Sequence, residues 1–587
     1  KPFLYDGENW HDKDRAEKHY AKFFDEPIQK AERNLILDTI KYTWEVERDN
    51  EAGLLDAANH YVHLDEQSIT INEENNVASI TIQQTVRNLT YQNQETVMHF
   101  TLPEEAVLTG VWLSDEKDKL LKYPYALAPK GAAQAVYKAE VNRRVDPALL
   151  EQVGPYQYRL RAYPVLPKPR RVNVDENGKM GSKLAEPLFV RFTYEALADS
   201  QGNWPMPKIL EKRNIFWDGD TKHVVNGETL YSSETLNGFP KPSALPKAKS
   251  ETSTLIFQVG DQQIQAVERQ KDQVPLPKKA RFAVLIDGSY SMRDQYSDTL
   301  IALTELSQQG VQYDSYFCQE SCEVFSAKNG LNPPMFFGNS QTLDHLQAFA
   351  KIKHETPYDA VLLLTDAGSY ELAEENHKPL SLPKPLWLVH LGKALPYAYD
   401  DKVLDTLYRS KGGIATSAQE ALRRYHLLGN GELPSKLMAP GDAKLISVSK
   451  RHLWFARPVK ASSSRPSAIA AAHWIRHLIQ TLDTEKLDTL DQIHQAAKQH
   501  NIVTHYSSML VLVNDRQKEA LKKAEEQDDR FDREVETGKQ SASSPSDPFA
   551  VPAVPEPEEW ALIIIALMFL SYTLWSRRRE RITRYAF

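Results

Sequence analysis

The stretch that decides the fold of the middle of the chain is Phe282-Ala283-Val284-Leu285-Ile286-Asp287-Gly288-Ser289-Tyr290-Ser291. An apolar run that ends in an acid is typical of a parallel strand buried on both faces. The sequence predicts a helix at about 296–309, a second apolar strand at 360–365, followed by Asp366, and a third at 386–391. Strands that alternate with helices predict a doubly wound α/β domain, which we place at residues 276–428.

Polar oxygens gather where the first two of these strands end. Asp287, Ser289 and Ser291 alternate along a loop that we expect to be extended, so that all three side chains can point to one side. Asp366 follows the second strand, and ligands in such sheets bind outside the carboxyl ends of the strands. Hard oxygen donors without His or Cys suit Mg²⁺ better than zinc. The alternative interpretation is an Asp-capped loop whose two serines satisfy helix donors.

Upstream of this domain the apolar residues follow a period of two. In the segment 79–86, Ile80, Ile82 and Val86 fall on one face of a strand. We therefore predict a mostly β domain, in the form of a sandwich, at residues 59–200. The remaining globular segments are an irregular, partly β connector at 201–275 and a closing α/β segment at 429–525, with a helix at 468–482 and a strand-like run at 501–513.

The β region resembles the VIT domain, which vault proteins share with inter-alpha-trypsin inhibitor heavy chains. The likeness rests on 102–107, Val136-Tyr137, 146–152 and 158–164, and the run Asp146-Pro147-Ala148-Leu149-Leu150-Glu151 is its strongest part. No catalytic role attaches to VIT domains. Although Asp146 and Glu151 form a candidate carboxylate pair, we expect a loop cap at Asp146 and a solvated helix residue at Glu151.

The pattern Asp-x-Ser-x-Ser after a buried strand resembles the metal-ion-dependent adhesion site (MIDAS) of von Willebrand factor A (VWA) domains, and the VIT-like neighbour strengthens the likeness. The resemblance implies that Ser289 and Ser291 bind Mg²⁺, or Mn²⁺, through their hydroxyls, and that Asp287 and Asp366 hold it directly or through water. The family adds a threonine, usually after two glycines. Here the loop is Gly338-Asn339-Ser340-Gln341-Thr342, so Thr342 is our first choice and Ser340 the second.

The chain has two cysteines, which excludes a disulfide-built scaffold and a Cys-rich zinc ribbon. Cys318 and Cys322 flank three residues between two segments that look like the strands of a hairpin. A disulfide across the turn and a pair of free thiols are both open at this point.

The end of the chain is typical of a membrane anchor. The sixteen residues from Trp560 to Trp575 carry no charge. As a helix they span ~24 Å, against a hydrocarbon core of ~30 Å. We predict a single transmembrane helix at 560–576, with a buried core helix as the alternative. The positive-inside rule then leaves the basic tail 577–587 in the cytoplasm and the large domain on the outer side of the cell membrane.

Before this span, residues 526–559 have the composition of a disordered stalk and contain Pro555-Glu556-Pro557. The order of triplet, apolar span and arginine cluster resembles the PEP-CTERM sorting tail of exported bacterial proteins. The resemblance implies an exosortase-type membrane protease as a partner, and a plain anchor is the alternative. Residues 1–58 are expected to be a helical N-terminal segment, and we expect the natural chain to continue upstream of Lys1.

The composition and the motifs narrow the function. With 71 Lys and Arg against 79 Asp and Glu, the net charge of −8 gives no reason to expect nucleic-acid binding. The chain contains no zinc-protease His motif, P-loop, dinucleotide fingerprint or nucleophile elbow, so we do not expect an enzyme. We predict a membrane-anchored, envelope-facing adhesion module that grips an acidic side chain of a protein ligand through Mg²⁺. A cell-envelope scaffold without an ion-dependent ligand is the alternative.

Overall fold

The computed structural model describes residues 19–20 and 61–532, with gaps at 75, 115–122, 144–146, 170–172, 175–179, 182–183, 250–253, 270–273, 320, 327–333, 338–341, 353–356, 368–379, 394, 397, 431–442 and 460–465. Nearly all of the expected N-terminal helical segment, and the expected stalk beyond residue 532, transmembrane helix and basic tail, lie outside these residues. The chain divides into two compact units, Lys1–Ala542 and Ser543–Phe587, and every described residue belongs to the first. In that described part, no helix combines the length and apolarity needed to cross a membrane.

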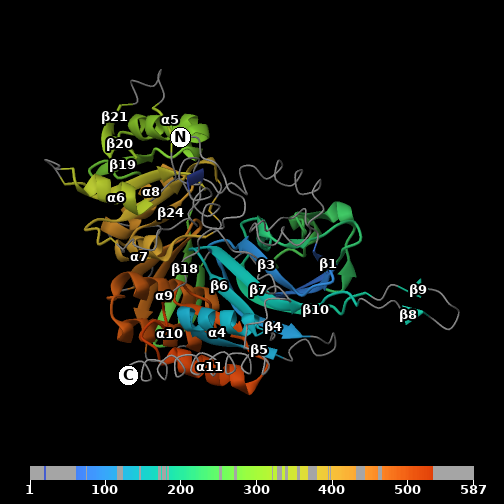
Figure 1. Ribbon diagram of the computed structural model, residues 1–587. Coiled ribbons are helices and arrows are strands. Elements are labelled where there is room, and N and C mark those ends of the chain that lie inside the picture. Colours follow the sequence, from blue (N-terminus) through green and yellow to red (C-terminus); the bar gives the residue numbers. More distant parts are fainter. Residues whose placement is uncertain are drawn as a thin grey trace, which may run out of the picture. The chain divides into compact units, whose positions relative to one another are not determined.

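The largest sheet has thirteen strands in the order β11-β3-β7-β6-β27-β5-β4-β10-β2-β1-β13-β14, with β12 paired to β1 (Figure 1). The buried residues Ile80, Ile82 and Val86 lie on β2, as the period of two predicts. Phe100 of β3 lies 5.6 Å from Phe192 of β10 between ring centroids, so distant strands of the sheet face each other as in a sandwich. The strands are β1 (Val62–Glu74), β2 (Val77–Asn88), β3 (Gln94–Thr101), β4 (Ala106–Ser114), β5 (Tyr123–Pro129), β6 (Ala148–Gln152), β7 (Gln157–Val165), β10 (Leu188–Leu197), β11 (Lys208–Arg213), β12 (Ile215–Phe216), β13 (Lys222–Val225), β14 (Glu228–Thr229) and β27 (Ser507–Val511).

Strands from two other segments complete this sheet. Strand β27 comes from the closing segment and lies between β5 and β6, antiparallel to both. Strands β11 to β14 come from the connector, and β13 runs parallel to β1. The β domain is therefore not confined to the consecutive residues 59–200. A period of two tells which face of a strand is buried, but not which strand lies beside it.

The second large sheet has six strands in the order β21-β20-β19-β22-β23-β24, and every neighbouring pair is parallel except β20 with β21. The strand order reverses at β19, because β20 lies on one side of it and β22 on the other, and in such sheets ligands bind outside the carboxyl ends of the strands at this point. The strands are β19 (Arg281–Asp287), β20 (Gln312–Cys318), β21 (Cys322–Phe325), β22 (Ala360–Thr365), β23 (Leu386–His390) and β24 (Gly413–Ala415).

Helices cover both faces of this sheet. Phe282, Val284 and Ile286 of β19 share a core with helices α5 and α8, whereas Ala283 and Leu285 share the other core with α6 and α7. The arrangement is thus doubly wound, and the strand is apolar throughout because each face packs against helices. The helices are α5 (Tyr296–Gln308), α6 (Thr342–Ala350), α7 (Asp401–Arg409) and α8 (Ala418–Asn430).

A third, antiparallel sheet joins the connector to the closing segment, in the order β17 (Thr254–Val259), β18 (Gln262–Glu268), β26 (His452–Pro458), β25 (Lys444–Val448). Trp454 of β26 stacks on His473 of helix α9, with ring centroids 3.9 Å apart. The remaining elements are α4 (Lys130–Asn142), α9 (Ala468–Thr481), α10 (Leu487–Gln499), α11 (Asp515–Glu525), the two-residue strands β8 (Asn173–Val174), β9 (Met180–Gly181), β15 (Thr235–Leu236) and β16 (Phe239–Pro240), and the 3₁₀ turns η4 (Ser232–Glu234), η5 (Pro242–Ala244), η7 (Ser291–Gln295) and η9 (Leu391–Lys393).

Glu151 corrects one expectation, because it is neither solvated nor helical. It lies on β6 and is fully buried, and Arg159 of β7 donates to its Oε2 from Nε at 2.9 Å and from a terminal nitrogen at 2.7 Å. Gln134 of α4 donates to its Oε1. A buried carboxylate needs such partners, and they come from elements that the local pattern did not connect. Asp146 lies outside the described residues.

Candidate metal site at the carboxyl edge of the parallel sheet

Asp287 is the last residue of β19, and two hydrogen bonds hold its side chain in place. Its side chain is fully buried. Its Oδ1 accepts a hydrogen bond from the backbone N–H of Ser289 at 2.9 Å, and its Oδ2 accepts one from the hydroxyl of Thr365 on β22 at 2.7 Å. The carboxylate is therefore held between the carboxyl ends of the two central strands, β19 and β22.

The two serines bring their hydroxyls close together. Ser289 is buried, and its Oγ lies 3.4 Å from Oγ of Ser291, the first residue of η7. The loop is not extended as we expected, because Tyr290 between the serines has helical dihedral angles (φ −60°, ψ −39°). The turn still places both hydroxyls together. Neighbouring oxygens around octahedral Mg²⁺ lie about 3 Å apart, so a small movement of the two serine side chains would let both hydroxyls bind one ion.

Thr342 contributes a buried hydroxyl at the start of helix α6. It is the first residue of α6, its side chain is buried, and its hydroxyl has no hydrogen-bond partner among the described residues. A buried hydroxyl without a partner costs about 1–3 kcal/mol, which a bound cation or its water would recover. Ser340, the second choice from the sequence, lies outside the described residues.

Asp366 directly follows β22 and is largely buried. Its backbone carbonyl accepts a hydrogen bond from Nδ1 of His390 at 2.7 Å, and Nε2 of His390 is 2.7 Å from the hydroxyl of Tyr399. Burial lowers the pKa of His390 to about 4, so the imidazole is neutral at pH 7. This histidine thus fixes the backbone of Asp366 without adding a charge to the site.

His345 also lies at the site, and the sequence analysis missed it. It follows Thr342 by one turn of α6, and its Nε2 lies 3.2 Å from Oδ1 of Asp287. Its Nδ1 lies 3.3 Å from the carbonyl oxygen of Gln319, so both ring nitrogens face oxygens. Burial lowers the pKa of His345, but the hydrogen bond and charge of Asp287 outweigh this and raise the pKa above its ordinary value. The local sequence gives no hint of this contact, because Asp287 is 58 residues away in the chain.

The candidate site combines hydroxyl and carboxylate oxygens with one histidine. His345 contacts the Asp287 carboxylate, and Ser289 Oγ pairs with another serine hydroxyl, so the described contacts contain no serine–histidine pair. Within the described ranges, no group of three His, Cys, Asp or Glu side chains is arranged to hold a metal ion. The candidate ligand set therefore rests on the hydroxyls of Ser289, Ser291 and Thr342 together with the two aspartates.

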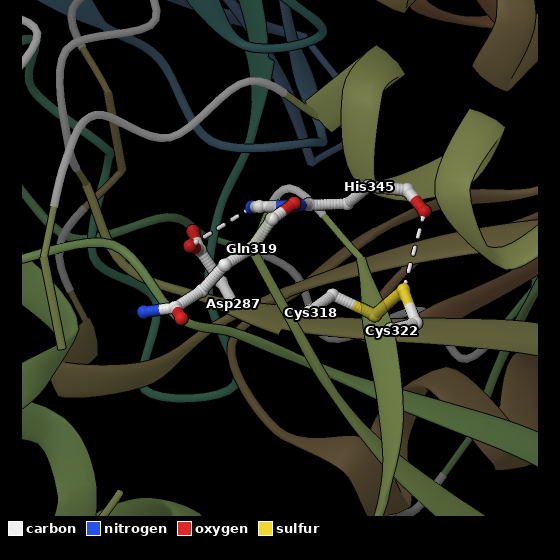
Figure 2. Close-up of a disulfide and its surroundings, with 5 residues drawn as sticks. All are labelled: Asp287, Cys318, Gln319, Cys322 and His345. Carbon is white, nitrogen blue, oxygen red and sulfur yellow. Dashed lines mark hydrogen bonds and ion pairs between the residues drawn. A yellow bond between two sulfur atoms is a disulfide. The ribbon is translucent and has the colours of Figure 1, made fainter. Parts of the chain in front are cut away.

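A disulfide lies next to Asp287 (Figure 2). Cys318 is the residue of β20 paired with Asp287 of β19, and its sulfur is bonded to that of Cys322 at 2.03 Å. The backbone N–H of Gly288 donates to the carbonyl of Cys318 at 2.8 Å. Of the two interpretations left open by the sequence, the structure has the disulfide.

Comparison with known proteins identifies the first part of the chain. Residues 64–175 match the family described as the Vault protein inter-alpha-trypsin (VIT) domain, so the chain contains a VIT domain. Strands β10 to β14 and β27 lie beyond the matched range although they share its sheet. The chain matches none of the curated proteins.

Several solved structures share local resemblance with the chain. CaCohA2 from Clostridium acetobutylicum is 8% identical and aligns over 29% of this chain and 95% of its own, with a TM-score of 0.15. ACE19, the collagen-binding subdomain of the Enterococcus faecalis surface protein ACE, is 10% identical over 24% of this chain and 90% of its own, with a TM-score of 0.14. A type III cohesin module of the cell-surface anchoring scaffoldin ScaE from Ruminococcus flavefaciens is 15% identical over 26% and 66%, with a TM-score of 0.13. Likenesses this weak carry no argument about function.

Proposed function

We propose that this chain is a protein-binding module whose α/β domain holds Mg²⁺, or Mn²⁺, at its carboxyl edge and through it grips an acidic side chain of a protein ligand. The VIT domain suggests a protein-interaction module. The order of the six-stranded sheet and the Asp-x-Ser-x-Ser loop support the resemblance of the second domain to von Willebrand factor A domains.

The buried hydroxyl of Thr342, which has no hydrogen-bond partner in the described part of the chain, carries the proposal. Thr342 lies one turn before His345 on helix α6, and His345 lies 3.2 Å from Asp287. A buried threonine without a partner is a cost unless a ligand uses it. The resemblance to von Willebrand factor A domains requires a threonine, and Thr342 is our candidate for it. An Asp-capped loop alone would not explain why this hydroxyl is buried.

The residues divide into two roles. The hydroxyls of Ser289, Ser291 and Thr342 would bind the ion directly, and Asp287 and Asp366 would hold it directly or through water. Mg²⁺ prefers six oxygens and retains waters, so one position stays open to an incoming carboxylate. The ion supplies positive charge, and the hydrogen bonds from Thr365 and the Ser289 N–H keep Asp287 aligned.

The cellular setting is proposed from the sequence alone. Residues 560–576 would anchor the chain in a cell membrane with the large domain outside, and an exosortase-type protease would act on the tail that contains Pro555, Glu556 and Pro557. A cell-envelope scaffold without an ion-dependent ligand is the competing hypothesis, and it predicts that Mg²⁺ does not bind at Asp287.

Titration calorimetry of the full chain with Mg²⁺ and Mn²⁺ tests the proposal. We expect saturable binding that Asp287→Asn abolishes. The matched control is Asp294→Asn, which removes the same charge from a residue of η7 whose side chain is 74% exposed. Binding that survives Asp287→Asn, or its absence from the wild type, would rule out this site and favour the scaffold.

A further inference from the structure

The turn closed by the disulfide is built into the wall of the candidate metal site. Strand β20 lies directly beside β19, and Cys318 is in register with Asp287. On the other side Cys318 pairs with Cys322 of β21, the antiparallel edge strand. The disulfide therefore locks the hairpin at the level of the metal-binding loop.

The turn holds both backbone groups of Gly288, the residue after Asp287. The N–H of Gly288 donates to the carbonyl of Cys318 at 2.8 Å, and the side-chain amide of Gln319 donates to the carbonyl of Gly288 at 2.9 Å. The same amide donates to the carbonyl of Met335 at 2.8 Å. A Cβ at position 288 would lie 2.4 Å from Cγ of Gln319, so glycine is required for this close approach. The backbone N–H of Phe337 also donates to the carbonyl of Gly288, at 3.1 Å, so Gln319 and Phe337 together hold the loop.

The turn also holds the histidine that contacts Asp287 (Figure 2). The carbonyl of Gln319 lies 3.3 Å from Nδ1 of His345, whose Nε2 lies 3.2 Å from Oδ1 of Asp287. The carbonyl oxygen of His345 lies 3.5 Å from Sγ of Cys322, a contact without a hydrogen because a disulfide sulfur has none. The disulfide turn therefore reaches the Asp287 carboxylate by two routes, through Gly288 and through His345.

We propose that the Cys318–Cys322 disulfide is a positioning element of the metal site, so that its reduction by a dithiol weakens the binding of Mg²⁺ and Mn²⁺. The inference rests on the proposed function. Gln319 and His345 act as positioning residues, since they orient Gly288 and Asp287. Partners that orient metal ligands in this way typically contribute 10–100-fold to affinity, so we expect reduction to weaken binding roughly tenfold.

The exposure of the two sulfurs determines which of them the reductant attacks in thiol–disulfide exchange. Cys318 is fully buried, whereas Cys322 is half-buried on the edge strand. A thiolate of the dithiol therefore attacks Sγ of Cys322, and Cys318 leaves as a thiolate that takes up a proton. The second thiol of the reductant then displaces Cys322, which gives two cysteine thiols and one oxidised, cyclic dithiol. Afterwards the turn is held by backbone pairing to the four-residue strand β21 and by the hydrogen bond from the N–H of Gln319 to the carbonyl of Ser321 at 2.9 Å.

The test measures Mn²⁺ affinity of the full chain by electron paramagnetic resonance, first oxidised, then after dithiothreitol treatment and its anaerobic removal. We expect about tenfold weaker binding after reduction. The double variant Cys318→Ser/Cys322→Ser should match the reduced protein and should not respond to dithiothreitol. Equal or tighter binding by the reduced protein would overturn the inference, whereas failure of the oxidised wild type to bind Mn²⁺ would overturn the proposed function itself.

Two further variants separate positioning from a general loss of folding. Gln319→Ala keeps the disulfide but removes the amide that holds Gly288, and it should weaken Mn²⁺ binding in the oxidised protein. Val324→Ala is the matched control, because Val324 lies on β21 of the same hairpin and is 81% exposed. We expect its affinity to equal that of the wild type. Unchanged binding by Gln319→Ala would refute transmission through Gly288.

Discussion

Replacing Thr342 by valine should change stability and metal binding in opposite directions. Valine has the same shape as threonine and puts a methyl group where the hydroxyl is, so the packing of α6 is preserved. In the metal-free protein the hydroxyl is buried and has no partner among the described residues. Its removal therefore abolishes a desolvation cost of about 1–3 kcal/mol, and we expect the free energy of unfolding to rise by about 1–2 kcal/mol.

Metal binding should respond the other way. If Thr342 is a ligand, its loss should cost at least the roughly tenfold affinity that even outer partners of metal ligands contribute. The control is Thr299→Val in α5, since Thr299 is equally buried but donates to the carbonyl of Gln295 at 3.0 Å. Losing that hydrogen bond should lower the free energy of unfolding by about 1 kcal/mol.

Urea unfolding in the presence of a chelator gives the first quantity, and calorimetric titration with Mg²⁺ the second. A less stable Thr342→Val protein would mean that the hydroxyl has a partner, and the reasoning from desolvation would be refuted. A more stable variant with unchanged Mg²⁺ affinity would support the desolvation argument but show that Thr342 is not a ligand.

Three further predictions concern the fold around the site. Arg424→Ala should lower the free energy of unfolding by about 3 kcal/mol in a urea titration, because it removes the cation that binds the Glu104 carboxylate at 2.8 and 3.0 Å and leaves that carboxylate with the neutral backbone N–H of Lys450 at 2.6 Å. A loss no larger than that of an exposed ion pair would contradict this prediction. Burial lowers the pKa of His494 to about 4, so the contribution of this residue to the free energy of unfolding, roughly 3 kcal/mol, is complete above pH 6.5 and is lost as the pH falls toward 4. His494→Gln should therefore reduce the dependence of the free energy of unfolding on pH between pH 6.5 and 4. An unchanged slope would count against this prediction. Gly412→Ala should lower the free energy of unfolding by about 3 kcal/mol, since the added Cβ would lie 1.7 Å from the backbone carbonyl oxygen of Leu386. A variant that unfolds at the same temperature as the wild type would disprove this clash.

The sequence alone determined the elements whose surroundings are uniform. The strands at 282–287 and 360–365 were predictable because a strand covered by helices on both faces must be apolar at every position. Helix α5 at Tyr296–Gln308 confirms the helix predicted at about 296–309. The position of the Asp-x-Ser-x-Ser loop was predictable as well, because the loop directly follows such a strand in the chain and so lies at its carboxyl end.

Only the tertiary structure decided which distant segments meet. It inserted β27 between β5 and β6, buried Glu151 against Arg159, and brought His345 to Asp287. It also determined that the hydroxyl of Thr342 is buried without a partner in the described ranges and that the disulfide turn holds Gly288. Periodicity records the face on which a residue lies, whereas the identity of its neighbour is set by the packing of segments that lie far apart in the chain, such as β27 and β5.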